Sequence, residues 1–153
     1  MIRAWRIVKT RFAADAFSGE GGRLHPGRWH SAGHRVVYCA SSFPLATLEL
    51  LVHVSRNDTA FHYSVLNCWF PEAIVEDIDR SRLPADWRAY PPPATLQQIG
   101  NEWLLNRSSA VLCVPSAVLD TEVNYLLNPE HDDFRSVDVG LPYPFTLDSR
   151  LVT

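Results

Sequence analysis

The most constraining feature of the sequence is a nearly continuous apolar run, residues 43–54, that contains one carboxylate, Glu49. The apolar residues recur at helical spacing, so the run predicts a helix of the protein core. Glu49 falls on the same stripe of that helix as Leu45, Leu48 and Val52. Burying a carboxylate without a partner costs free energy, so Glu49 is expected to have either a structural partner or a functional role.

Two interpretations of Glu49 follow from its neighbours. The helix is expected to begin after a cap at Ser41 or Ser42 and to end near Ser55. His53 lies four residues after Glu49 and therefore shares its face. Glu49 could form a structural pair with His53 or with an arginine. It could equally belong to a polar strip that lines a cavity, and the residues alone leave both interpretations open.

The remaining segments predict one α+β domain over residues 1–153, with a mixed sheet and few helices. A glycine-rich loop is expected at Phe17–Gly22, a proline-rich connection at Pro84–Pro93 and a second helix at Thr95–Arg107. Phe134–Val139 is expected to pair with the strand at Val123–Leu127. Further strands are expected at Ala4–Lys9, Arg35–Ala40, His62–Phe70, Ala73–Ile78 and Ala110–Val114, with an edge strand within Pro142–Val152.

Composition excludes several classes of protein. The net charge is −3 and no run of Lys or Arg occurs, so direct binding to nucleic acid is not expected. The apolar stretches are too short to cross a bilayer and the N-terminus lacks a signal peptide. Cys39, Cys68 and Cys113 lie far apart, as is typical of reduced thiols in a cytoplasmic protein. The histidines form no tight ligand set, so no metal site is expected.

Arg28 and Tyr38 are candidates for binding a ligand. Arg28 stands on a turn between Gly27 and Trp29, where a guanidinium suits a phosphate or a ribose. The alternative for Arg28 is stacking on Trp29 or pairing with a carboxylate. Tyr38, on a short strand, could stack on a flat ring or donate a hydrogen bond, although most strand tyrosines only pack.

Polar residues at strand ends supply further candidates. Ser116 follows a predicted apolar strand but lacks the flanking glycines of a hydrolase nucleophile, so it either caps a turn or belongs to a site. Asn124 is a turn residue by default and a ligand contact if it faces the same cleft. Trp69, Trp87 and Tyr143 are the aromatic residues that could form a homodimer surface, although the sequence does not separate them from core residues.

Together these motifs resemble the RES domain family, which is named for its Arg, Glu and Ser. The resemblance runs from about Ala4 to the C-terminus, and all three named residues are present as Arg28, Glu49 and Ser116. It rests on the order and spacing of Phe17-x-Gly19-x-Gly21, Gly27-Arg28-Trp29, Val37-Tyr38, Leu45-Ala46-x-x-Glu49, Pro115-Ser116 and Asn124-Tyr125-Leu126-Leu127-Asn128-Pro129.

The resemblance implies a fold related to the ADP-ribosyltransferases and a toxin paired with an Xre-type helix-turn-helix antitoxin. It implies NAD as substrate, either cleaved at its nicotinamide–ribose bond by water or phosphate, or used to ADP-ribosylate a host protein. A module that only binds a ligand is a third alternative, and it predicts no loss of NAD.

The residue types suit cleavage of NAD. Glu49 would stabilise the positive charge that develops on the ribose, and Arg28 would hold the diphosphate or the ribose. Tyr38 would stack on nicotinamide, and Asn124 is expected to contact NAD. Ser116 would bind nicotinamide or ribose, or would hold Glu49 in place, while His53 is a weaker candidate for supporting Glu49.

Overall fold

The computed structural model describes residues 1–54 and 62–152. Strand β1 (Ile2–Lys9) pairs along its whole length with β3 (Tyr63–Phe70), and together they form the longest ladder of an eight-stranded sheet. The strand order is β4-β5-β6-β2-β1-β3-β7, with β8 also on β3. All pairs are antiparallel except β4 with β5. The other strands are β2 (Val37–Ala40), β4 (Val75–Asp77), β5 (Val111–Pro115), β6 (Val123–Leu127), β7 (Asp138–Val139) and β8 (Tyr143–Phe145).

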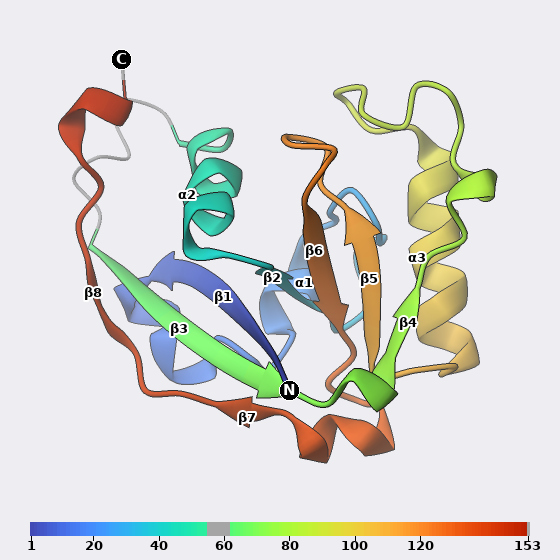
Figure 1. Ribbon diagram of the computed structural model, residues 1–153, viewed down its shortest axis with the longest axis horizontal. Coiled ribbons are helices and arrows are strands. Elements are labelled where there is room, and N and C mark those ends of the chain that lie inside the picture. The colour runs from blue at the N-terminus through green and yellow to red at the C-terminus, as the bar shows by residue number, and fades with distance from the viewer. Residues whose placement is uncertain (55–61, 153) are drawn as a thin grey trace.

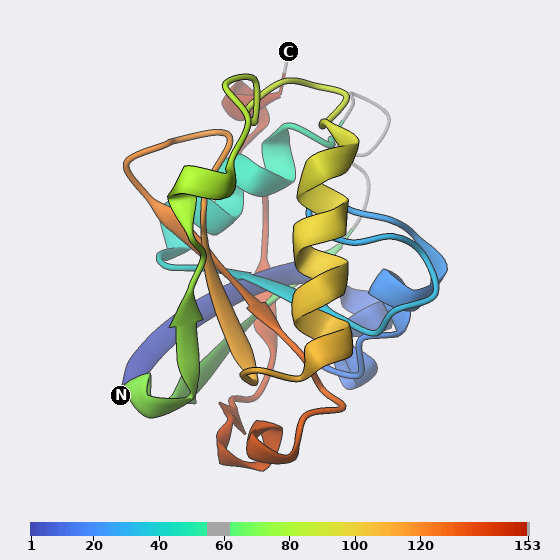
Figure 2. The same ribbon diagram turned by 90° about the vertical axis from the view of Figure 1, so that its right-hand side faces the viewer.

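The sheet is curled into two wings, which β2 joins (Figure 1). One wing holds β1 and β3, and the other holds β4, β5 and β6. Helix α3 (Ala94–Asn106) covers the outer side of the second wing (Figure 2), and α2 (Phe43–Leu51) lies at the end of the molecule where the wings separate. The third helix, α1, spans Glu20–Leu24. Short 3-10 helices occur at Thr10–Asp15, Glu72–Ile74, Arg80–Arg82, Asp132–Ser136 and Ser149–Leu151.

Two apolar clusters lie on opposite faces of the second wing. On the outer face, α3 contributes a helical stripe that packs on Leu112, Val114 and Leu126. Between the wings, strand residues of both halves form the second cluster, which includes Val37, Phe70 and Val111. The stripe of α3 consists of Leu96, Ile99, Trp103 and Leu104, as its spacing predicts. Burial of both faces explains why β5 is apolar throughout.

Helix α2 departs from the expectation of a core helix. Ser42 caps it, because its side chain accepts a hydrogen bond from the backbone N of Leu45 at 3.1 Å. Within α2 only Leu45 and Ala46 are fully buried, and Val52, just after its end, is 58% exposed. One side packs on the sheet through those two residues, while the rest of α2 stays partly open to solvent. The expected end near Ser55 lies outside the described residues.

The glycine-rich segment is not simply a loop. The prediction of a loop over Phe17–Gly22 is wrong in its second half, because α1 begins at Glu20. Gly19 adopts a left-handed conformation (φ 78°) directly before the helix, which a side chain would strain. Gly22 lies so close to Val36 that a Cβ would stand 2.6 Å from its carbonyl oxygen. The glycines therefore permit a short helix to sit tightly against the chain that leads into β2.

The pairing predicted for Phe134–Val139 is also wrong. The first half of this segment belongs to a 3-10 helix, and its last two residues form β7, which pairs with β3 instead of β6. The reason is that β6 already has β5 on one edge and β2 on the other, so no edge is free. The edge strand expected within Pro142–Val152 is confirmed as β8, which also pairs with β3.

No helix in residues 1–54 and 62–152 has the length and apolar character needed to cross a bilayer.

Gly100 of α3 provides a test of how the helix meets the chain before β2. A Cβ at this position would stand 1.6 Å from the carbonyl oxygen of Trp29, so Gly100→Ala must force the two segments apart. We expect the free energy of unfolding to fall by at least about 1–3 kcal/mol, measured by urea denaturation. Gly21→Ala is the control, because a Cβ there meets nothing within 4 Å. Equal stabilities for the two variants would contradict this packing.

Candidate active site

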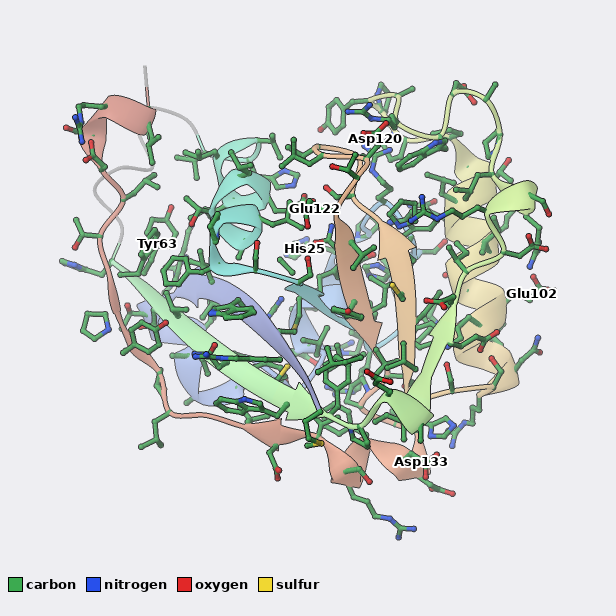
Figure 3. All side chains as sticks on the ribbon, viewed as in Figure 1. His25, Tyr63, Glu102, Asp120, Glu122 and Asp133 are labelled. Carbon is green, nitrogen blue, oxygen red and sulfur yellow. The ribbon has the colours of Figure 1, made fainter. Side chains whose placement is uncertain are left out.

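A cavity of about 970 Å³ opens between α2, the ends of β2 and β6, the chain at residues 25–30 and the proline-rich loop (residues 84–93). Its volume lies at the upper end of the range of roughly 300–1,000 Å³ for sites that bind small molecules. Figure 3 shows His25, one of its lining residues, between α2 and β6 in this view. Most of the site candidates line it, namely Arg28, Tyr38, Glu49, His53 and Asn124.

Glu49 is held by Ser116, which directly follows β5, and by Asn124 of β6. Its Oε1 accepts a hydrogen bond from Ser116 Oγ at 2.7 Å and another from Asn124 Nδ2, also at 2.7 Å. Within the described part of the chain, no hydrogen bond engages the second oxygen, Oε2. Glu49 therefore has a fixed orientation and one carboxylate oxygen left to meet a ligand.

Ser116 is completely buried beneath Glu49. Its hydroxyl donates to Glu49 and accepts hydrogen bonds from the backbone N of Val118 and of Leu119, each at 3.1 Å. A serine hydroxyl has one proton and two lone pairs, so these three bonds use its full capacity. Of the two roles open from the sequence, the geometry favours holding Glu49 over direct contact with a ligand.

Asn124 lies on β6 opposite Ala40 of β2 and lines the cavity. Its Nδ2 is committed to Glu49, whereas its Oδ1 is buried and has no hydrogen-bond partner among the described residues. A buried acceptor without a donor is costly, so Asn124 Oδ1 is a natural point for a ligand hydroxyl or a water to bind.

Arg28 extends from a tight turn, residues 27–31, which we term the arginine turn. The backbone N of Gly27 donates to the carbonyl of His30 at 3.1 Å and closes it. Arg28 Nη1 donates to the carbonyl oxygens of Trp87 and Ala89 in the proline-rich loop, at 2.8 and 3.0 Å. Burial lowers the pKa of Arg28, while the nearby Glu49 carboxylate acts in the opposite direction.

The alternative of Arg28 stacked on Trp29 does not describe the structure. Trp29 is only 3% exposed and packs with Leu96 and Trp103 in the cluster under α3. Two polar residues of α3 hold the arginine turn, because Gln97 Nε2 donates to the carbonyl of Gly27 at 3.0 Å and Asn101 accepts from the backbone N of Ser31 at 2.9 Å. Sequence reasoning missed both, although their i, i+4 spacing beside an apolar stripe was a visible signal.

Tyr38 presents its ring to the cavity while its hydroxyl is engaged behind it. The hydroxyl lies 2.7 Å from His30 Nδ1 and accepts a long bond from the backbone N of Trp29 at 3.3 Å. His30 Nε2 faces the carbonyl oxygens of Gly22 and His25, so it carries the ring proton and Nδ1 accepts from Tyr38. Burial raises the pKa of Tyr38, which keeps the phenol neutral.

His30 was not among the sequence candidates. It is 2% exposed, and desolvation by burial lowers its pKa. Because two of its partners are backbone carbonyl oxygens, no pattern of residue types could have identified it. Of the histidines, the sequence instead favoured His53, which lines the cavity but is exposed.

Two more arginines border the cavity and were also missed. Arg6 of β1 donates to the carbonyl oxygens of Ala16 and Tyr38, each at 2.9 Å. Arg88 of the proline-rich loop donates to the carbonyl of Ala117 at 3.0 Å and lies 3.3 Å from an Asp120 oxygen. Asp120 is at the upper end of the molecule in Figure 3, near this loop.

The charge of the cavity differs from that of the whole chain. Within the described residues, three arginines line it and Glu49 is the single acidic residue that does so, although the net charge of the protein is −3. In the same part of the chain, no three His, Cys, Asp or Glu residues gather as metal ligands. The arrangement suits an anionic ligand whose positively charged end lies at Glu49.

Comparison with known proteins gives one family over nearly the whole chain, because residues 3–148 match the RES domain. A protein named Toxin Res from Photorhabdus laumondii is 38% identical over 149 residues, which are 97% of this chain and 96% of that protein. Toxin Res of Yersinia enterocolitica is 38% identical over 148 residues, 96% of this chain and 97% of that protein. A Prs ADP-ribosylating toxin from Sphingobium is 29% identical over 153 residues, 97% of this chain and 95% of that protein.

A solved structure shares the fold. The crystal structure of the M. tuberculosis MbcT–MbcA toxin–antitoxin complex contains a chain that matches with a TM-score of 0.79 at 18% sequence identity. The match covers 94% of this chain and 84% of the other. The expectation of a single α+β domain with a mixed sheet and few helices is therefore confirmed, and the structure adds that the sheet is curled.

The buried His30 generates a prediction about pH. Its pKa in the folded protein lies below the unfolded value of about 6.5, so its contribution to stability is complete above that pH and is lost as pH falls through the folded value. We expect the melting temperature to fall as the pH decreases below about 6.5, and to fall less in His30→Gln. An identical pH dependence in both proteins would exclude His30 as the cause.

Proposed function

The chain belongs to the RES domain family, and we propose that it is a toxin of a toxin–antitoxin pair that breaks the nicotinamide–ribose bond of NAD. Two relatives named Toxin Res, each 38% identical over nearly the full length of both chains, support the role of toxin. The chemistry is supported by the residues that line the cavity.

The observation that carries the proposal is the fixed carboxylate of Glu49. Breaking the bond between nicotinamide and ribose places positive charge on the ribose, as in glycoside hydrolysis. A carboxylate that is already oriented by Ser116 and Asn124 can stabilise this charge without reorganising. Nicotinamide leaves as a neutral molecule and needs no acid to protonate it, so a single carboxylate suffices.

The arginines would bind the diphosphate of NAD. NAD carries a diphosphate, and guanidinium groups bind phosphate oxygens through pairs of parallel hydrogen bonds. Arg28 lies within electrostatic reach of Glu49, so a diphosphate bound to Arg28 would bring the adjacent ribose to the carboxylate. The free Oδ1 of Asn124 would accept a hydrogen bond from a ribose hydroxyl.

Tyr38 completes the proposed site. Because His30 and Trp29 engage its hydroxyl, the part of Tyr38 that remains for a ligand is the face of its ring. An aromatic face suits the flat nicotinamide ring, and an offset stack of two rings stabilises a complex by about 0.5–1.5 kcal/mol beyond burial.

The acceptor of the ADP-ribose group separates two versions of the proposal. Water or phosphate as acceptor would deplete NAD, and this is the version we favour. Transfer to a host protein is the alternative, and the name of the Sphingobium relative, a Prs ADP-ribosylating toxin, supports it. Both versions act on NAD in the cytoplasm, and neither requires a metal.

The proposed partner is an antitoxin of the Xre helix-turn-helix type. The structural relative was solved as a toxin–antitoxin complex, which supports a neutralising partner for this chain as well. Self-association is a separate proposal, for which Tyr143, at 40% exposure, is available, whereas Trp87 packs against the cluster under α3.

Glu49→Gln tests the chemistry directly. The amide oxygen still accepts from Ser116 and Asn124, so the fold should persist, whereas the negative charge is lost. We expect NAD turnover to fall by about 10²- to 10³-fold, the range seen when one preorganised electrostatic group is removed. Glu102→Gln is the control, since Glu102 is an exposed carboxylate paired with Arg82. Unchanged NAD consumption by Glu49→Gln would rule out this mechanism.

Incubating the protein with NAD labelled in its ADP-ribose part identifies the acceptor. Free ADP-ribose or its phosphate adduct supports depletion of NAD, and label retained on protein supports transfer. NAD that binds without being consumed would contradict both versions and support a binding module.

Ser116→Ala tests the role assigned to its hydroxyl. Glu49 would lose one of the two bonds that orient it, so we expect kcat to fall about 10- to 100-fold with little change in KM. Ser42→Ala is the matched control, because it removes a hydroxyl that caps α2 and should cost about 1 kcal/mol of stability without lowering kcat. A large rise in KM with kcat intact would show that Ser116 binds the substrate.

A further inference from the structure

Tyr90, in the proline-rich loop, has a large aromatic side chain that is open to solvent. Its side chain is 83% exposed, more than any other aromatic ring in the described part of the chain, and it lines the cavity. A single exposed aromatic residue is common on protein surfaces, so exposure alone does not indicate a ligand or a partner. A ligand is favoured here because the ring belongs to the lining of a site.

The loop is fastened at the two residues that precede Tyr90, Arg88 and Ala89. Arg28 Nη1 donates to the carbonyl of the preceding residue, Ala89, at 3.0 Å. Arg88 ties the same loop to the carbonyl of Ala117 at 3.0 Å and to Asp120. The loop is therefore anchored, although the ring itself is exposed. A ring on an anchored loop can stack on a ligand without the cost of ordering the loop on binding.

The lining residues follow an order that matches a dinucleotide. Arg28 is near both of the other groups, because its guanidinium donates to the backbone carbonyl directly before Tyr90 and both Arg28 and Glu49 line the cavity. NAD has the same sequence of parts: nicotinamide riboside, diphosphate, adenosine. With the reacting ribose at Glu49 and the diphosphate at Arg28, adenosine extends to the loop that bears Tyr90.

We propose that Tyr90 is the stacking platform for the adenine ring and so selects an adenine dinucleotide over a nicotinamide mononucleotide, an inference that rests on the proposed function. Adenine is flat and uncharged, and aromatic side chains bind bases through their faces. Arg88, two residues before Tyr90, places a cation on the same rim. A mononucleotide lacks adenosine and would not reach the platform.

The test compares two ligands that differ at the adenosine end. ADP-ribose and nicotinamide mononucleotide are titrated into the wild type, Tyr90→Ala, Tyr90→Phe and Phe12→Ala by calorimetry, alongside KM and kcat for NAD. Phe12 is the control, being a 50% exposed aromatic ring that is not part of the cavity lining. Binding measurements require no turnover.

We expect binding to weaken only when the ring of Tyr90 is removed, and only for ligands that contain adenosine. In Tyr90→Ala, the Kd for ADP-ribose and the KM for NAD should rise about 5- to 150-fold, the range for one base stacked on an aromatic side chain, with kcat unchanged. The Kd for nicotinamide mononucleotide should stay constant. Tyr90→Phe should bind as the wild type does, because stacking does not need the hydroxyl, and so should Phe12→Ala.

Two outcomes would overturn the inference. Unchanged affinity of Tyr90→Ala for ADP-ribose would show that adenine does not use the ring. Equal weakening of both ligands would show that Tyr90 supports the loop and does not select adenosine. A wild-type protein that binds ADP-ribose but never consumes NAD contradicts the proposed function, while the comparison of variants still decides the role of Tyr90.

Discussion

The hydrogen bond from Ser116 to Glu49 is the contact on which the candidate site depends. It joins α2, which packs on the sheet through little more than Leu45 and Ala46, to the far wing at the end of β5. Asn124 adds a second bond from β6 to the same oxygen. These bonds explain how a carboxylate on an apolar helix is tolerated, since two donors offset its loss of hydration while one oxygen stays available to a ligand.

A second set of contacts fixes the opposite side of the cavity. Helix α3 packs closely on the arginine turn at Gly100 and holds the turn through hydrogen bonds of Gln97 and Asn101. The backbone of Arg28 is therefore positioned by a helix. Arg28 then holds the proline-rich loop, and Arg88 of that loop reaches the residues after Ser116. Side chains on both walls of the cavity are therefore linked through one continuous series of hydrogen bonds.

Much of the fold followed from local patterns, and the errors have physical causes. The stripe of α3, a serine cap at Ser41 or Ser42 and the edge strand β8 were predictable because spacing and capping chemistry are local. The pairing of Phe134–Val139 failed because both edges of β6 were already occupied, which no local pattern records. The burial of α2 was overestimated because an apolar helix can border an open cavity as well as a core.

The sequence by itself determined which groups were available: a carboxylate in an apolar helix, an arginine on a turn, a strand tyrosine, a serine and an asparagine at strand ends. Arg28, Glu49, Ser116 and Asn124 come from segments far apart along the chain, and only the curled sheet brings them together. Tertiary structure alone decided that Ser116 supports Glu49, that His30 supports Tyr38 and that Tyr90 stands at the rim. Each of these roles depends on distances between segments and on backbone partners, and neither is encoded in residue type or spacing.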